Sequence, residues 1–129
     1  MNIEFFKPKE TNSACKVTVH KTGKLGFSKS ASDILDLKNN KYCKIGKDSN
    51  SEGADILFML VSTEKDEFSY KISKAGEYYY LKAKQLLLDL EIDYKNDETT
   101  TIYDIEKSKI NDIAFFKLMR RIIYKRKAK

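Results

Sequence analysis

Apolar and polar residues alternate over short stretches of this chain, and turn-forming residues separate the stretches. From Cys15 to Val19 every second residue is apolar, which is the period-2 pattern of a strand with one buried face. Lys21-Thr22-Gly23-Lys24 then predicts a hairpin turn in which Gly23 supplies the positive φ. Leu25 and Phe27 place the next apolar positions on one face of a second strand. These residues are therefore predicted to form a β-hairpin.

A short helix is predicted after this hairpin. Ser30 is followed three residues later by Asp33, which is the spacing of a capping box. Apolar residues then recur at helical spacing, so we expect the helix to cover residues 30–37. Asn39-Asn40 is expected to end it, because asparagine tolerates the left-handed conformation common at a helix exit.

Strands follow this helix, and the second half of the chain predicts a similar series of elements. Tyr42–Lys47 and Asp55–Ser62 are predicted as strands separated by the turn-rich sequence KDSNSEG. The unbroken apolar run Ile56–Val61 predicts that the second of them is buried on both faces. The second half is predicted to contain an alternating strand through Phe68, Tyr70 and Ile72, strands at Tyr78–Leu81, Thr100–Glu106 and Asp112–Leu118, and a helix at Ala83–Leu90.

The two halves of the chain also match each other in sequence. Residues 20–37 align without gaps with residues 73–90, and six of the 18 pairs are identical. A second match follows in the same order, Asp55–Phe58 with Asp112–Phe115. Two matches in one order indicate an internal duplication of a strand–strand–helix–strand–strand unit.

This duplication sets the expected fold class and domain organisation. We expect a mainly β (α+β) fold in which tandem β-β-α-β-β repeats, at about 14–62 and 68–118, pack as one barrel. A chain of 129 residues is the size of one domain. The prediction is a single domain, 1–129, with a basic C-terminal tail at 117–129.

The duplication further assigns faces to the sequence Tyr78-Tyr79-Tyr80. Tyr78 and Tyr80 align with the apolar positions Leu25 and Phe27 of the first copy, so both are predicted to lie in the core. Tyr79 is then predicted to be exposed on the opposite face. An exposed aromatic ring near lysines can stack on the bases of a single-stranded nucleic acid.

Positive charge is concentrated at the two ends of the sequence. Residues 1–62 carry a net charge of +3, residues 63–116 carry −4, and residues 117–129 carry +7. The basic parts favour a polyanionic partner such as nucleic acid, and the acidic second repeat favours a basic protein partner.

The residues of catalytic and metal sites are sparse. Cys15 and Cys43 lie 28 positions apart and His20 is the one histidine, so the common zinc spacings are absent. The sequence has no glycine-rich phosphate loop and no apolar run long enough to span a membrane as a helix, and residues 1–10 do not have the pattern expected of a signal peptide. We therefore expect a cytoplasmic protein that is not an enzyme and needs no cofactor or metal.

The first copy resembles a known family through Gly23–Lys29 and Leu35–Ile45. A glycine turn, an alternating strand, a short helix and a second alternating strand in this spacing are similar to the AbrB-like swapped-hairpin family of bacterial DNA-binding regulators and antitoxins. Lys24 stands where that family has arginine, Ser28 where it has proline, and Asn40-Lys41 where Gly-Asp is usual. The resemblance implies a swapped-hairpin-like barrel and DNA binding in transcription regulation.

Two architectures and three binding functions follow. The alternative fold is the curved antiparallel sheet plus helix of Whirly and Pur-type proteins, in which the helix follows four strands. The leading function is binding of duplex DNA, mainly through phosphates; the alternatives are a protein-interaction or structural module and a single-strand binder. Oligomerisation is left open. The nucleic-acid-binding residues are predicted to be Lys16, Lys21, Lys24, Lys29, Arg120, Arg121, Lys125, Arg126 and Lys127.

Overall fold

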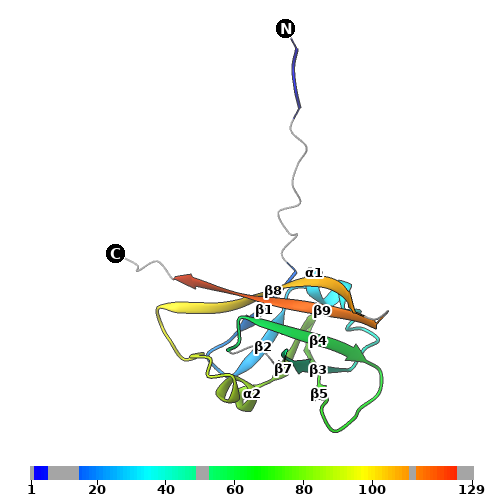
Figure 1. The fold of residues 1–129 in the computed structure, drawn as a ribbon, viewed down its shortest axis with the longest axis vertical. Coiled ribbons are helices and arrows are strands. Elements are labelled where there is room, and N and C mark those ends of the chain that lie inside the picture. The colour runs from blue at the N-terminus through cyan, green and yellow to red at the C-terminus, as the bar shows by residue number, and fades with distance from the viewer. Residues whose placement is uncertain (1, 6–14, 49–52, 111–112, 125–129) are drawn as a thin grey trace.

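The computed structural model describes residues 2–5, 15–48, 53–110 and 113–124. Within these residues the chain forms nine strands and two short helices (Figure 1). Their bounds are β1 Lys16–Val19, β2 Lys24–Phe27, α1 Lys29–Ile34, β3 Tyr42–Gly46, β4 Ile56–Ser62, β5 Tyr70–Lys71, β6 Ser73–Ala75, β7 Tyr78–Lys82, α2 Lys84–Asp89, β8 Thr99–Ile110 and β9 Ile113–Tyr124.

All nine strands belong to one antiparallel sheet that curves into a nearly closed barrel. The strand order is β5-β3-β4-β9-β8-β1-β2-β7-β6. β5 and β6 are separated by Ile72 alone, yet they stand at the two ends of this order. The chain from Tyr70 to Ala75 therefore passes from β3 to β7 and brings the two edges of the sheet together. The predicted mainly β barrel is confirmed.

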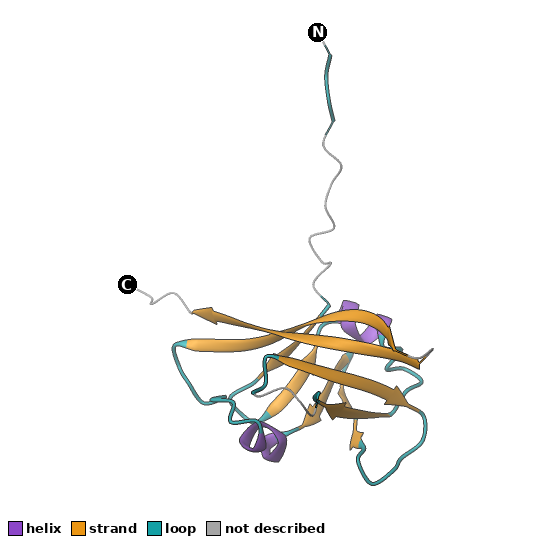
Figure 2. Ribbon diagram, viewed as in Figure 1, coloured by secondary structure: helices purple, strands orange, loops and turns teal. Residues whose placement is uncertain are grey.

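The two copies contribute equivalent elements to the barrel. The first gives β1-β2-α1-β3-β4 and the second gives β5/β6-β7-α2-β8-β9. Each helix interrupts its copy after the hairpin, as the tandem repeat predicts, and the two helices lie on opposite sides of the barrel (Figure 2). Both helices exit through a left-handed residue, Asp36 at φ 50° and Glu91 at φ 57°.

The barrel interior is filled by apolar side chains from both copies. Phe27, Met59, Leu81 and Leu118 are each less than 2% exposed and belong to one continuous core. β4 contributes to this core on one face only, because Leu57 and Met59 are buried while Ile56 is 40% exposed. The prediction that this strand is buried on both faces was wrong, since Phe58 and Leu60 on the outer face are only half-buried and Ile56 is exposed.

The first helix begins earlier and ends earlier than its sequence pattern suggests. The N-cap is Ser28 instead of Ser30, because the Ser28 Oγ accepts hydrogen bonds from the backbone N–H of Ala31 at 3.2 Å and of Lys16 at 3.1 Å. A cap at this position ties the helix to β1. The left-handed exit falls at Asp36, three residues before the predicted Asn39-Asn40.

Candidate functional site

The face assignment of the three consecutive tyrosines is the opposite of the predicted one. Tyr79 packs against the core, whereas Tyr78 is 42% exposed and Tyr80 is half-buried on the outer surface. The turn before β7 is one residue shorter than the turn before β2: two residues lie between the paired Ala75 and Tyr78, whereas three lie between His20 and Lys24, whose N–H and carbonyl are hydrogen-bonded. A slip of one residue exchanges the two faces of a strand.

Tyr78 and Tyr80 form the centre of an outer surface on β1, β2 and β7, which we call the Tyr–Lys face. It consists of His20, Lys24, Tyr78, Tyr80 and Lys82. The two tyrosine rings are stacked, with their centroids 6.4 Å apart and their planes 19° apart. The Lys24 Nζ lies 4.8 Å from the centroid of the Tyr80 ring, within range of a cation–π interaction.

Gly26 makes this surface flat enough for a ring to lie on it. A Cβ placed on Gly26 would be 1.4 Å from the Tyr78 Oη and 2.5 Å from the His20 Nε2. The Tyr78 side chain therefore covers the glycine and reaches His20, where Oη and Nε2 are hydrogen-bonded at 2.7 Å. Any larger residue at position 26 would occupy the space of the ring.

The electrostatics of the face are set by its lysines. Lys24 and Lys82 lie directly opposite each other in the β2–β7 register, and neither forms an ion pair with a described residue. Like charges in this position repel each other. Partial burial, with a smaller effect of Lys24, lowers the pKa of His20 below its ordinary value of 6.5, so the imidazole is neutral at pH 7. The face thus carries positive charge from lysine alone.

Two hollows adjoin the Tyr–Lys face, one on either side. The first, of about 520 Å³, lies between α1 and the β6–β7 turn and is lined by Tyr78, Lys29 and Lys74 among others. The second, of about 370 Å³, is lined by His20, Lys24 and Lys21 and by threonines at the start of β8.

The structure brings together some of the residues that the sequence predicts as a binding site. Lys24 is part of the Tyr–Lys face and Lys29 lines the first hollow next to it. Lys16 lies on the same outer face of β1, beside β2. Lys21 lines the second hollow, where its ammonium group forms an ion pair with Asp97.

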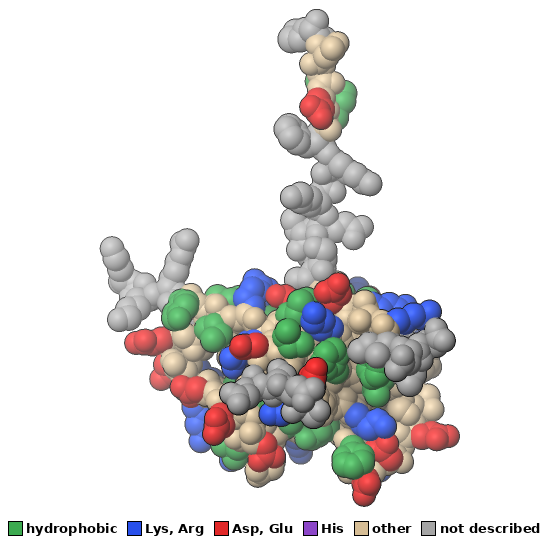
Figure 3. Space-filling view, in the orientation of Figure 1, with side chains coloured by type: hydrophobic (Ala, Val, Ile, Leu, Met, Phe, Trp, Pro, Cys, Tyr) green, Lys and Arg blue, Asp and Glu red, His purple; other side chains and the backbone are tan. Residues whose placement is uncertain are grey.

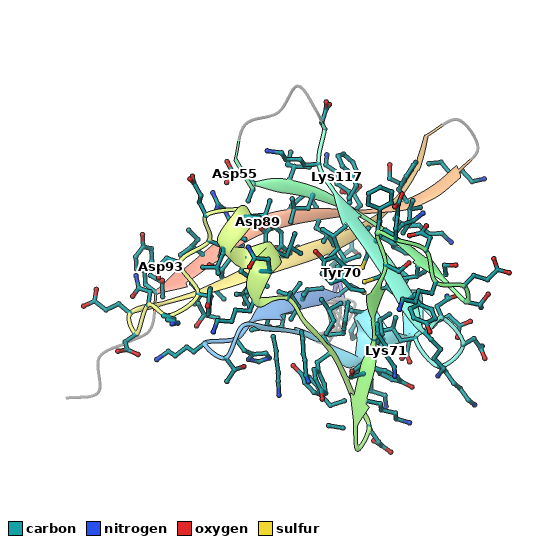
Figure 4. The ribbon with its side chains drawn as sticks, turned by 90° about the horizontal axis from the view of Figure 1, so that it is seen from below. Asp55, Tyr70, Lys71, Asp89, Asp93 and Lys117 are labelled. Atoms are coloured by element: carbon teal, nitrogen blue, oxygen red, sulfur yellow. The ribbon has the colours of Figure 1, made fainter. Side chains whose placement is uncertain are left out.

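The two arginines of β9 are paired with carboxylates, and the partner of Arg121, Asp104, lies directly opposite Lys16 in the β1–β8 register. Arg120 forms an ion pair with Asp55, at the start of β4 beside β9 (Figure 4). Arg121 makes two bonds, at 3.0 and 3.1 Å, with the carboxylate of Asp104. The other predicted contact residues, Lys125, Arg126 and Lys127, lie outside the described residues.

Other chemistry has little support in the described part of the chain. Burial raises the pKa of the Cys43 thiol to about 12, so this group stays protonated. No group of three or more histidine, cysteine or acidic side chains among the described residues could hold a metal ion. Neither described helix is long and apolar enough to cross a membrane.

Sequence reasoning missed Tyr78 and Tyr80 as surface residues and did not place Lys82 among the nucleic-acid-binding residues. The sequence signal that could have placed the tyrosines is Glu77. This charged residue stands between Gly76 and the first residue of β7, whereas in the first copy β2 begins directly after Gly23. No family model matches this chain, and comparison with curated proteins and with solved structures gave no match. The geometry of the site therefore has to support any functional conclusion.

Proposed function

We propose that this protein binds single-stranded nucleic acid through the Tyr–Lys face and catalyses no reaction on it. The observation that carries the proposal is the pair of stacked, solvent-facing rings of Tyr78 and Tyr80 with Lys24 and Lys82 next to Tyr80. Bases of a single strand stack on such rings whatever their sequence, and lysines neutralise the phosphates between them. The unfavourable approach of Lys24 to Lys82 is relieved when a phosphate lies between them.

Single strands are favoured over the duplex DNA expected from the sequence. In a duplex the bases are stacked on each other and cannot stack on tyrosine. Base-specific reading of a duplex relies on arginine above all, and Arg120 and Arg121 are already bound to Asp55 and Asp104. We therefore expect weak sequence preference and strong dependence on salt.

A basic protein partner for the acidic second repeat has less support. Asp97 and Asp104 are two of its carboxylates, and each is paired with a lysine or arginine of the same chain. Pairing removes much of the negative field that would attract such a partner.

The test is fluorescence anisotropy with labelled single-stranded and duplex oligonucleotides at several salt concentrations. Tyr80→Ala removes one stacking ring, which is worth about 1–3 kcal/mol per base and so weakens single-strand binding by about tenfold or more. Lys24→Ala removes a phosphate contact and lowers the slope of log affinity against log salt by about 0.7. Tyr42→Ala and Lys71→Ala, on β3 and β5, are the matched controls and leave binding unchanged (Lys71 is labelled in Figure 4).

The outcomes separate the candidate functions. Tighter binding of single strands that depends on Tyr80 supports the proposal. Equal binding of duplex and single strands with no effect of Tyr80→Ala would favour the phosphate-only duplex binder. No binding at low salt would refute both nucleic-acid functions and leave a protein-interaction module.

A further inference from the structure

The C-terminal half of β9 has an open edge that carries apolar side chains. β4 pairs with β9 only from Phe116 to Met119, and the last bond on that side runs from the Arg120 N–H to the Asp55 carbonyl. Backbone groups alternate in direction along a strand, so those of Ile122 and Tyr124 point to this same side. No described residue pairs with them there.

The side chains along this open edge are exposed. Ile122 is 47% exposed, Ile123 is 38% exposed and Tyr124 is 77% exposed. Figure 3 shows apolar side chains over this end of the molecule, at the left of the view. An unpaired strand edge with apolar side chains is a template for another strand.

The opposite edge of the same hairpin is built differently. The Ile105 N–H donates to the Cys15 carbonyl, and beyond that bond no described residue pairs with β8 on this side. The side chains here are charged and exposed, with Glu106, Lys107 and Lys109. Charged residues, lysine above all, are the usual protection of an edge against added strands. The apolar edge of β9 lacks that protection, which favours a strand as its occupant.

A segment with matching chemistry lies in the same chain. Residues 2–5 project away from the barrel (Figure 1), and Ile3 and Phe5 are 70% and 87% exposed. In a strand, Ile3 and Phe5 share one face and Glu4 takes the other. When Ile3 and Phe5 pack beside Ile122 and Tyr124, Glu4 falls on the same face as the basic Arg121.

The direction in which the chain enters β1 favours another copy as the donor of this segment. β1 is antiparallel to β8, and Lys16 pairs with Asp104. Cys15 therefore enters β1 from the side of the β8–β9 turn, whereas Tyr124 lies at the other end of the hairpin.

We propose that Asn2–Phe5 of a second copy adds as a strand to the open edge of β9 at Ile122–Tyr124, and that two copies exchange these segments in a two-fold dimer. Each exchanged strand forms hydrogen bonds with the unpaired backbone groups of one β9 edge. It also buries the apolar side chains of that edge against Ile3 and Phe5 of the donor segment.

Sedimentation velocity of the full chain over a wide range of concentration tests this proposal. Ile122→Pro removes an N–H that points to the open edge and not to β8, so it blocks the added strand while the hairpin stays intact. Ile3→Asp with Phe5→Asp disables the donor segment. We expect each variant to raise the dimer dissociation constant by about tenfold or more. Lys109→Pro, on the protected edge, is the matched control and keeps the dimer.

Mixing the variants identifies the pairing. The edge-blocked and donor-blocked proteins, each monomeric alone, together form a dimer with one exchanged strand if the proposal holds. A wild-type protein that is monomeric at every concentration overturns it. So does a donor-blocked variant that still dimerises, because its copies must then pair through some other surface. Circular dichroism of each variant confirms that it is folded.

Discussion

Substitution of Gly26 by alanine tests whether the position of Tyr78 matters for binding. The added Cβ would lie 1.4 Å from the Tyr78 Oη, and ordinary van der Waals contact begins at 3.4 Å, so the hydroxyl must move by about 2 Å. That movement breaks its 2.7 Å hydrogen bond with His20. The obstacle is the end of a surface side chain, so the barrel itself is not disturbed.

The expected change in stability is small and the expected change in binding is large. Alanine is favoured over glycine within a strand by about 0.5–1 kcal/mol, and loss of an exposed hydrogen bond costs about the same. The free energy of unfolding in urea therefore changes by less than about 1 kcal/mol. Affinity for a single-stranded oligonucleotide falls by about tenfold, the contribution of one stacked base.

A double-mutant cycle tests whether Gly26→Ala weakens binding by displacing the Tyr78 ring. Because Gly26→Ala acts by moving Tyr78, adding it to Tyr78→Ala causes little further loss of affinity. Gly46→Ala is the matched control, since a Cβ on Gly46 meets no atom within 4 Å. Wild-type affinity of Gly26→Ala, or additive losses in the cycle, would refute the role assigned to the ring.

Three further predictions concern the cap, the histidine and the cysteines. Ser28→Ala removes the acceptor of two backbone N–H groups and lowers the free energy of unfolding by about 1–2 kcal/mol in urea titrations. The pKa of His20 is lowered in the folded state, so the unfolded state binds the proton more readily and stability falls as pH drops below 6.5; His20→Gln lacks this part of the pH dependence. A thiol reagent modifies the half-buried Cys15 in the native protein and reaches the buried Cys43 only after denaturation.

The sequence predicts the order and type of the main elements because local patterns determine them. The hairpin of β1 and β2, both helices and the strands up to β9 all arise from apolar periodicity and turn residues near in sequence. Closure of the barrel depends instead on Tyr70–Ala75, which bends at Ile72 where the N–H donates to the Lys41 carbonyl. No local pattern in six residues reveals that its two halves pair with strands on opposite edges.

The binding face could not be predicted because the repeats drift in register. The sequence alignment pairs Leu35 with Leu88, but the left-handed residues Asp36 and Glu91 show that the helices are equivalent at an offset of 55. Two residues have entered the second copy between the turn and the helix exit. An identity-based alignment hides that insertion, and the face of Tyr78 depends on the one residue of it, Glu77, that precedes the strand.

Exchange of one charge on the Tyr–Lys face distinguishes a binding surface from a structural one. Lys82→Glu replaces a like-charged pair with Lys24 by an opposite pair in the same register, which stabilises the fold by up to about 1 kcal/mol. The same change places a carboxylate where a phosphate would lie. The variant is expected to unfold at a higher urea concentration than the wild type because of the new ion pair. If the face binds nucleic acid, the variant also binds single strands at least tenfold more weakly. If both stability and affinity are unchanged, the lysine pair is an ordinary solvated surface and the proposed function loses its electrostatic basis.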